Sequence, residues 1–229
     1  MKQTLSSAIV VLLVITVVMV VHGHAGQLPD TGQSKCYDAN GNVLDPCPQP
    51  GEPFYGQDAQ YQRPRSYTKL DAGGNALSDS AAAWVMVRDN VTGLIWEVKT
   101  DDGSIHDKDN TYTWYDSNPA TNGGDAGTPG AGTDTEDFIN ALNSGSGYCG
   151  HTDWRLPTVK ELSSLTDSGR VSPGIDMTYF KWTQSSNYWS STTNAYSTYY
   201  AWLVYFGYGD VYYGYKSNNY YVRAVRSGP

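Results

Sequence analysis

The stretch AYSTYYAWLVYFGYGDVYYGYKSNNYY (195–221) decides the expected fold, because it reads as short strands separated by turn residues. More than half of the chain's 19 tyrosines lie in it, mixed with Ser, Asn, Gly and Asp. Its first strand alternates between two sets of residues, namely Trp202, Val204 and Phe206 in one set and Leu203, Tyr205 and Gly207 in the other. Successive side chains of a strand point to opposite faces. The first set is therefore predicted to face the core and the second to face solvent.

A tyrosine-rich, turn-rich surface has the composition of a binding surface. Tyrosine offers a large rigid ring and a hydroxyl while losing little side-chain entropy, and Ser, Gly and Asn supply adaptable hydrogen bonds. Two other interpretations remain open at this point. The tyrosines could form ordinary cross-strand pairs in a twisted sheet, or they could mark an aggregation-prone edge.

Upstream of this stretch the sequence predicts further strands. Residues 84–87 and 94–98 flank an Asp-Asn-Val-Thr-Gly turn and indicate a β-hairpin. Four more strand-like segments follow near the end of the chain, at 186–193, 201–206, 210–216 and 220–226. They are rich in aromatic and β-branched residues and are separated by Gly, Ser and Asn.

Two short helices are predicted from capping boxes. Thr133 stands three residues before Glu136, and Thr158 stands three residues before Glu161. The buried stripes are expected at Phe138, Ile139 and Leu142 in the first helix and at Val159, Leu162 and Leu165 in the second. Two short helices packed on twisted antiparallel strands define an α+β fold.

The amino terminus predicts export. Lys2, the apolar run 8–21 and Gly23-His24-Ala25 have the pattern of a signal peptide, which we place at 1–25. An uncleaved anchor is the alternative; after cleavage no membrane span is expected. A Pro- and Gly-rich lead-in is expected at 26–66 and the main domain at 67–229. The predicted location is secreted, periplasmic or at the cell surface.

The cysteines and the charge balance fit an exported binding protein. Cys36 and Cys47 bracket a turn-rich segment and are predicted to form a disulfide, while Cys149 is expected to be a small buried residue. The formal net charge of −8 argues against nucleic acid as a partner. Residues 118–133 are predicted to form a flexible surface insertion.

An acidic segment raises the question of a metal. Asp101, Asp102, Asp107 and Asp109 offer carboxylates for calcium, but their spacing does not match an EF-hand. A solvated acidic loop is the favoured interpretation, and no metal or cofactor is expected. Arg155, Arg223 and Arg226 are expected to make structural ion pairs or hydrogen bonds to carbonyl groups.

Several motifs resemble a known family. GLIWEVKT (93–100), DWRLPTVKEL (153–162), YWSSTT (188–193) and YVRAVR (221–226) occur in the order found in the C-terminal domain of the Legionella collagen-like adhesin. The resemblance extends from about 84 to 226. It implies a C-type lectin-like fold, in the variant shared with formylglycine-generating enzymes. The cysteines that those enzymes use near the end of the fold have no counterpart after Cys149, so their activity is not implied.

A narrower resemblance concerns the variable proteins of diversity-generating retroelements, which write a copy with mutated adenines into the end of a gene. It implies a variable region at about 188–226 in which residues reachable from an AAC codon alternate with framework residues such as Trp202, Val204, Phe206 and Lys216. Leu203 is expected to be an exposed member of the variable set. The predicted ligand-binding positions are Tyr196, Ser197, Tyr199, Tyr200, Leu203, Tyr205, Gly207, Tyr208, Asp210, Tyr212, Tyr213, Gly214, Tyr215, Ser217, Asn218, Asn219 and Tyr220.

The sequence thus predicts a secreted or surface-displayed protein that binds a protein or glycan ligand on a cell or phage surface. The alternative is a fixed adhesin for a glycan or a surface polymer. No Ser-His-Asp order, nucleotide-binding glycine loop or zinc-ligand spacing is present in the sequence, so an enzyme is not expected.

Overall fold

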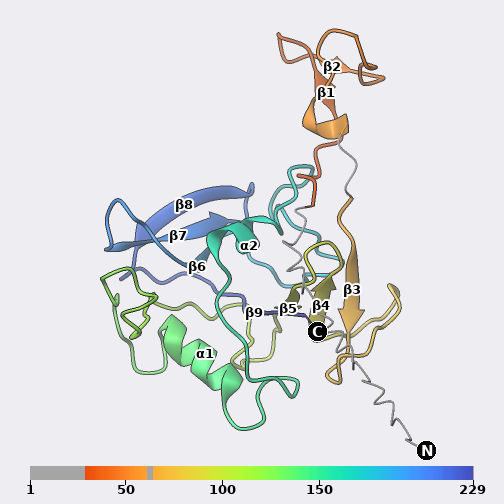
Figure 1. Ribbon diagram of the computed structural model, residues 1–229. Coiled ribbons are helices and arrows are strands. Elements are labelled where there is room, and N and C mark those ends of the chain that lie inside the picture. Colours follow the sequence, from red (N-terminus) through yellow and green to blue (C-terminus); the bar gives the residue numbers. More distant parts are fainter. Residues whose placement is uncertain (1–28, 61–63, 229) are drawn as a thin grey trace, which may run out of the picture.

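Three antiparallel sheets and two α-helices form the part of the chain that the computed structural model describes, residues 29–60 and 64–228 (Figure 1). This mixture agrees with the predicted α+β class. The expected signal peptide, 1–25, lies outside the described residues. Within those residues, none of the helices is long and apolar enough to cross a membrane.

The sheets are built from nine short strands in the described residues. The first sheet pairs β1 (Cys36–Tyr37) with β2 (Val43–Leu44). The second has the order β3 (Tyr67–Leu70), β4 (Met86–Asp89), β5 (Ile95–Glu97) and β9 (Val225–Arg226). The third has the order β6 (Asn187–Thr193), β7 (Tyr200–Tyr205) and β8 (Asp210–Tyr215). Because β9 pairs with β5, the end of the chain returns to the second sheet.

The predicted hairpin at 84–98 is confirmed as β4 and β5, with Val87 opposite Trp96. Its turn is stabilised by Asp89, whose carboxylate accepts hydrogen bonds from the backbone amides of Val91 and Thr92. Gly93 closes the turn with a φ of 76°, a conformation that other residues adopt with strain. The sequence therefore specifies this hairpin locally.

Both predicted helices are present, and one of the two predicted caps is wrong. Helix α2 (Val159–Ser163) has the expected capping box, in which Thr158 and Glu161 exchange side-chain and backbone hydrogen bonds. Helix α1 (Thr135–Asn143) is capped by Asp134 instead of Thr133, since the Asp134 carboxylate accepts the Asp137 amide hydrogen at a donor–acceptor distance of 2.8 Å. The negative charge of this carboxylate also interacts favourably with the positive, amino-terminal end of the helix dipole.

Strand β7 is buried on both faces, which contradicts the prediction of a single core face. Val204 belongs to one hydrophobic cluster, together with Tyr188 and Leu162. Leu203 belongs to a second cluster on the other side of the sheet, and its side chain is only 1% exposed. Phe206 is buried as predicted. The expectation of an exposed Leu203 is wrong because β7 is the central strand between two cores.

The lead-in is more structured than a loop. Cys36 and Cys47 form the predicted disulfide, with their Cα atoms 5.4 Å apart. The hairpin of β1 and β2, followed by the 3-10 helix η1 (Asp58–Gln60), projects away from the sheets (Figure 1). Cys149 is half-buried, and burial raises the pKa of its thiol.

The segment 118–133 is anchored to the third sheet, so the prediction of a flexible insertion is wrong. Lys216 places its ammonium nitrogen 3.2 Å from the carbonyl oxygen of Asn122 and 2.6 Å from that of Asp125. The hydroxyl of Thr193 donates a third hydrogen bond, again to the Asn122 carbonyl. These contacts, from the last residue of β6 and from the residue that follows β8, hold the loop against the third sheet.

Candidate functional site

Strand β8 is the exposed edge of the third sheet and carries the predicted tyrosines. Tyr212, Tyr213 and Tyr215 are 52%, 56% and 54% exposed, although they alternate along the strand and so lie on both of its faces. An edge strand has a neighbour on one side only, and here neither face is covered by a core. The tyrosine-rich surface, by which we mean the 17 predicted positions, is therefore centred on a two-faced edge.

The structure distributes those 17 positions over three levels of burial. The exposed ones are Tyr196, Tyr199, Tyr208, Asp210, Tyr212, Tyr213, Tyr215, Ser217 and Asn219. The half-buried ones are Ser197, Tyr200, Tyr205, Asn218 and Tyr220. The buried ones are Leu203, Gly207 and Gly214; the two glycines have no side chain, and the side chain of Leu203 is almost fully covered.

One face of β8 carries an aromatic cluster, defined here as Tyr200, Trp202, Tyr213 and Tyr215. The ring centroids of Tyr200 and Tyr215 are 4.4 Å apart, and those of Trp202 and Tyr213 are 5.7 Å apart. The cluster follows the strand register, which sets Tyr200 opposite Tyr215 and Trp202 opposite Tyr213. Trp202, predicted to be a core residue, is only half-buried, and its ring contacts that of Tyr213 edge to face.

Near the turn between β7 and β8 lies a groove of about 400 Å³, which we call the tyrosine groove. The residues that line it are Asn187, Leu203, Tyr205, Tyr208, Asp210, Tyr212, Tyr213 and Tyr220. Strand pairing brings Tyr205 opposite Asp210 and Leu203 opposite Tyr212. The Tyr212 hydroxyl donates to Asp210 Oδ2 over 3.2 Å, and this carboxylate raises the pKa of Tyr212.

Two buried glycines position rings of the tyrosine groove. A Cβ atom on Gly207 would lie 2.3 Å from Cε1 of Tyr205, so the ring of Tyr205 lies directly over the glycine. A Cβ on Gly214 would lie 2.8 Å from Cε2 of Tyr220. Real Cβ atoms essentially never approach another heavy atom to less than 3.0 Å. Gly207 and Gly214 therefore act by making room for tyrosines, which corrects their predicted role as ligand contacts.

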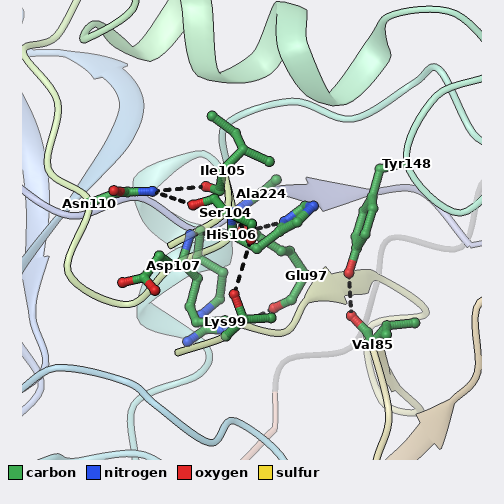
Figure 2. A network of polar contacts seen from close by, with 12 residues as sticks. Val85, Glu97, Lys99, Ser104, Ile105, His106, Asp107, Asn110, Tyr148 and Ala224 are labelled. Atoms are coloured by element: carbon green, nitrogen blue, oxygen red, sulfur yellow. Dashed lines mark hydrogen bonds and ion pairs between the residues drawn. The ribbon is translucent and has the colours of Figure 1, made fainter. Parts of the chain in front are cut away.

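A buried charged network that the sequence did not predict surrounds Glu97, the last residue of β5 (Figure 2). The Glu97 carboxylate contacts Lys99 Nζ at 3.1 Å and His106 Nδ1 at 2.7 Å, and it accepts the backbone amide hydrogen of Ala224. Burial alone would raise the pKa of Glu97, but the charge of Lys99 and the hydrogen bond from His106 lower it to about 2. We therefore assign the carboxylate its ionised form.

Arg223 completes this network from the carboxy-terminal segment. It is fully buried and donates to the carbonyl oxygen of Glu97 and to the hydroxyl of Thr183. Removing one member of such a group leaves the others uncompensated in a medium of low polarity. The sequence signal was present, since charged residues interrupt apolar strands in both IWEVK (95–99) and VRAVR (222–226).

The other arginines have the predicted structural roles. Arg155 makes two hydrogen bonds to the Glu161 carboxylate, at 2.8 and 2.7 Å, and Arg226 makes one to Asp153 at 2.8 Å. A cavity of about 620 Å³ lies beside Arg155, lined largely by apolar atoms of residues that include Trp114, Ile139 and Leu156. It is separate from the tyrosine groove in its lining residues.

Three of the four candidate calcium ligands come together. The carboxylates of Asp101, Asp107 and Asp109 lie within 4.8 Å of one another, and Lys108 pairs with Asp101 at 2.8 Å and with Asp109 at 2.7 Å. Asp102 points elsewhere and accepts hydrogen bonds from Thr100 and Ser104. Protein groups thus account for the geometry of this loop.

The chain belongs to the family of the Lcl C-terminal domain, whose model matches residues 85–226. This range agrees with the resemblance seen in the motifs and contains the whole tyrosine-rich surface. Membership indicates an adhesin-like surface protein, and the disulfide is compatible with an extracellular location. Comparisons with curated proteins and with solved structures give no match.

Proposed function

We propose that this protein binds a protein or glycan ligand through its tyrosine-rich surface while displayed on, or secreted from, a cell. The observation that carries the proposal is the exposure of the tyrosines of β8 on both faces of an edge strand. Tyr188 and Trp189 of β6 and Phe206, which follows β7, are buried in the cores, so the fold has other aromatic residues for packing. The tyrosines of β8 are left for contacts outside the molecule.

The physical basis is the value of a large ring at a binding surface. Contiguous exposed apolar surface on a soluble protein marks an interaction site. Tyr and Trp dominate the energy of protein interfaces, where a few central residues contribute most of the binding free energy. The aromatic cluster and the tyrosine groove each place several rings within contact distance of a single ligand.

The proposal extends to diversification by a retroelement on a C-type lectin-like framework. It is supported by the contrast between the 14 of 17 predicted variable positions that are exposed or half-exposed and framework residues such as Val204, Phe206 and Val222, which are fully buried. Leu203 no longer supports it, since a buried leucine is explained by packing. Substitutions at the exposed positions would change the surface with little effect on folding.

A fixed adhesin for a glycan is the second candidate, and the family membership favours it. Aromatic rings also stack on sugar rings, and such a surface would need no diversification. The acidic balance of 23 acidic against 15 basic residues argues against sulfated chains as the ligand. Both candidates treat the surface as a binding site, and the proposal includes that the protein is not an enzyme.

Binding is tested with a variant that replaces Tyr205, Tyr208, Tyr212 and Tyr213 by Ser. We expect loss of binding to cell surfaces and glycan arrays, measured by flow cytometry and array fluorescence, with the thermal midpoint nearly unchanged. The matched control is Tyr55→Ser, which removes an exposed tyrosine from the lead-in. Unchanged binding by the fourfold variant would contradict the proposal.

Diversification is tested separately by deep sequencing of the 3′ end of the gene within one population. Substitutions limited to codons whose template copy carries adenine, at exposed positions, would support it. An invariant 3′ end with no template copy nearby would favour the fixed adhesin.

A further inference from the structure

The tyrosine groove combines aromatic rings with negative charge. Among the described residues that line it, the only formally charged side chain is that of Asp210. The rings of Tyr205 and Tyr208 meet at 5.6 Å with their planes inclined by 62°. The ring face of a tyrosine attracts a cation. The net charge of −8 on the whole chain also attracts cations at long range.

The groove also offers oxygen atoms that accept hydrogen bonds. Asp210 uses Oδ2 to accept the Tyr212 hydroxyl hydrogen, and within the described chain no donor contacts its Oδ1. Asn187 and the tyrosines also line the groove, and an amide or phenol side chain has an oxygen that can accept a hydrogen bond. A cation that carries several N–H donors can therefore bond to the carboxylate and to these neighbouring acceptors at the same time.

We propose that the tyrosine groove binds the primary ammonium group of a lysine side chain presented by a protein ligand. This inference rests on the proposed function, because it places the ligand on the same surface. The lysine stem would lie along the tyrosine rings, and its ammonium would donate to Asp210 Oδ1 and to neighbouring oxygens. Lysine side chains bury their methylene stems on apolar surface in this way.

The choice of a primary ammonium follows from the acceptors. A quaternary ammonium has no N–H groups and is recognised by ring faces alone, so it would give Asp210 Oδ1 no hydrogen bond from the ligand. An arginine guanidinium favours a bidentate carboxylate. Asp210 has one of its two oxygens already occupied by Tyr212, which leaves a single oxygen for the ligand.

The test uses N-acetyl-lysine methylamide as the probe and N-acetyl-norleucine methylamide as its uncharged control of similar shape. Binding is followed by amide chemical shifts in NMR titrations of the full exported chain, with dissociation constants expected on the order of millimolar. We expect the lysine probe to shift the resonances of Gly207, Asp210 and Gly214, and the norleucine probe to bind at least about fivefold more weakly. Equal binding of the two probes would overturn the inference.

Variants then locate the charge. Asp210→Asn keeps the shape of the side chain and is expected to weaken the lysine probe about fivefold. Glu52→Gln removes the same charge from the lead-in and is expected to leave the affinity unchanged. Lysine binding that persists in Asp210→Asn would overturn the inference, as would tighter binding of the trimethyl-lysine or arginine analogue.

The outcomes separate this inference from the proposed function. If the fourfold Tyr→Ser variant loses cell-surface or glycan binding while the lysine probe does not bind the native chain, the surface binds something other than an ammonium group. If the lysine probe binds and the fourfold variant keeps all surface binding, the groove is real but is not the adhesive site. If the native chain binds neither cell surfaces or glycans nor the lysine probe, both proposals fail.

Discussion

Strands β7 and β8 are adjacent, equal in length and similar in aromatic content, yet they have opposite environments. Strand β7 (YAWLVY) lies between two partners and has Leu203 in one core and Val204 in the other. Strand β8 (DVYYGY) has one partner, and all its residues except Gly214 are exposed. Position in the sheet therefore decides whether an aromatic strand packs or is available for binding, and predictions follow for each strand and for the framework below them.

The largest expected effect lies in the framework. Glu97→Gln leaves the buried Lys99 without its carboxylate partner and removes the negative charge near the buried Arg223, and we expect a loss of about 3–5 kcal/mol in the free energy of unfolding. Urea denaturation at neutral pH measures it. A loss in the free energy of unfolding of less than about 0.5 kcal/mol, the size expected for an exposed residue, would contradict the assigned ion pairs.

The same carboxylate predicts a dependence on pH. Because the folded pKa of Glu97 is about 2, below its ordinary value of 4.5, its contribution is present above pH 4.5 and is lost as the pH falls toward 2. The stability of the native chain should therefore decrease across this window. Glu97→Gln should show a flatter curve there, and parallel curves would count against the assignment.

The next effect concerns β7. Leu203→Ala is expected to cost about 2–5 kcal/mol, because it opens a cavity beside Trp189. The control on the neighbouring strand is Tyr212→Ser, described below. A cost under about 1 kcal/mol would mean that β7 is packed on one face only, as its alternation alone suggested.

A smaller effect is expected where the two strands meet. Gly207→Ala should cost about 1 kcal/mol, because the new methyl group displaces the Tyr205 ring. In a Tyr205→Ala background the same change should cost almost nothing. Thermal denaturation of the four chains of this cycle measures the coupling, and additive costs would contradict the contact.

The smallest effect is expected on β8. Tyr212→Ser removes an exposed ring and should change the free energy of unfolding by less than about 0.5 kcal/mol. Urea denaturation beside Leu203→Ala gives the comparison directly. A cost near that of Leu203→Ala would place β8 in the core and would remove the basis for a binding surface.

Much of the fold could be predicted from local signals. The hairpin of β4 and β5, the capping box of α2 and the disulfide of Cys36 depend on residues close together in the chain. The cap of α1 was misplaced by one residue because Thr133 and Asp134 are both good capping residues. Such neighbours compete, and only the backbone geometry decides between them.

The candidate site was harder to predict because alternation reports on one strand at a time. It cannot tell how many layers cover a strand, so Leu203 and Trp202 were assigned to the wrong environments. The burial of Lys216 depended on a loop about 90 residues earlier in the chain, which no local pattern indicates. The exposure of the β8 tyrosines was predicted correctly, since the runs of Tyr, Gly, Ser and Asn around them are too polar and too turn-prone to be buried throughout.

The contact between Gly207 and Tyr205 also limits how many different surfaces such a chain can form. Any side chain at 207 competes with a ring at 205 for the same space, and the pair Gly214 and Tyr220 has the same relation. In a set of related sequences, the residues at 205 and 207 would therefore covary, and so would those at 214 and 220. If the surface is diversified as proposed, each pair would change as one unit, and the number of distinct surfaces would grow more slowly than the number of changeable codons.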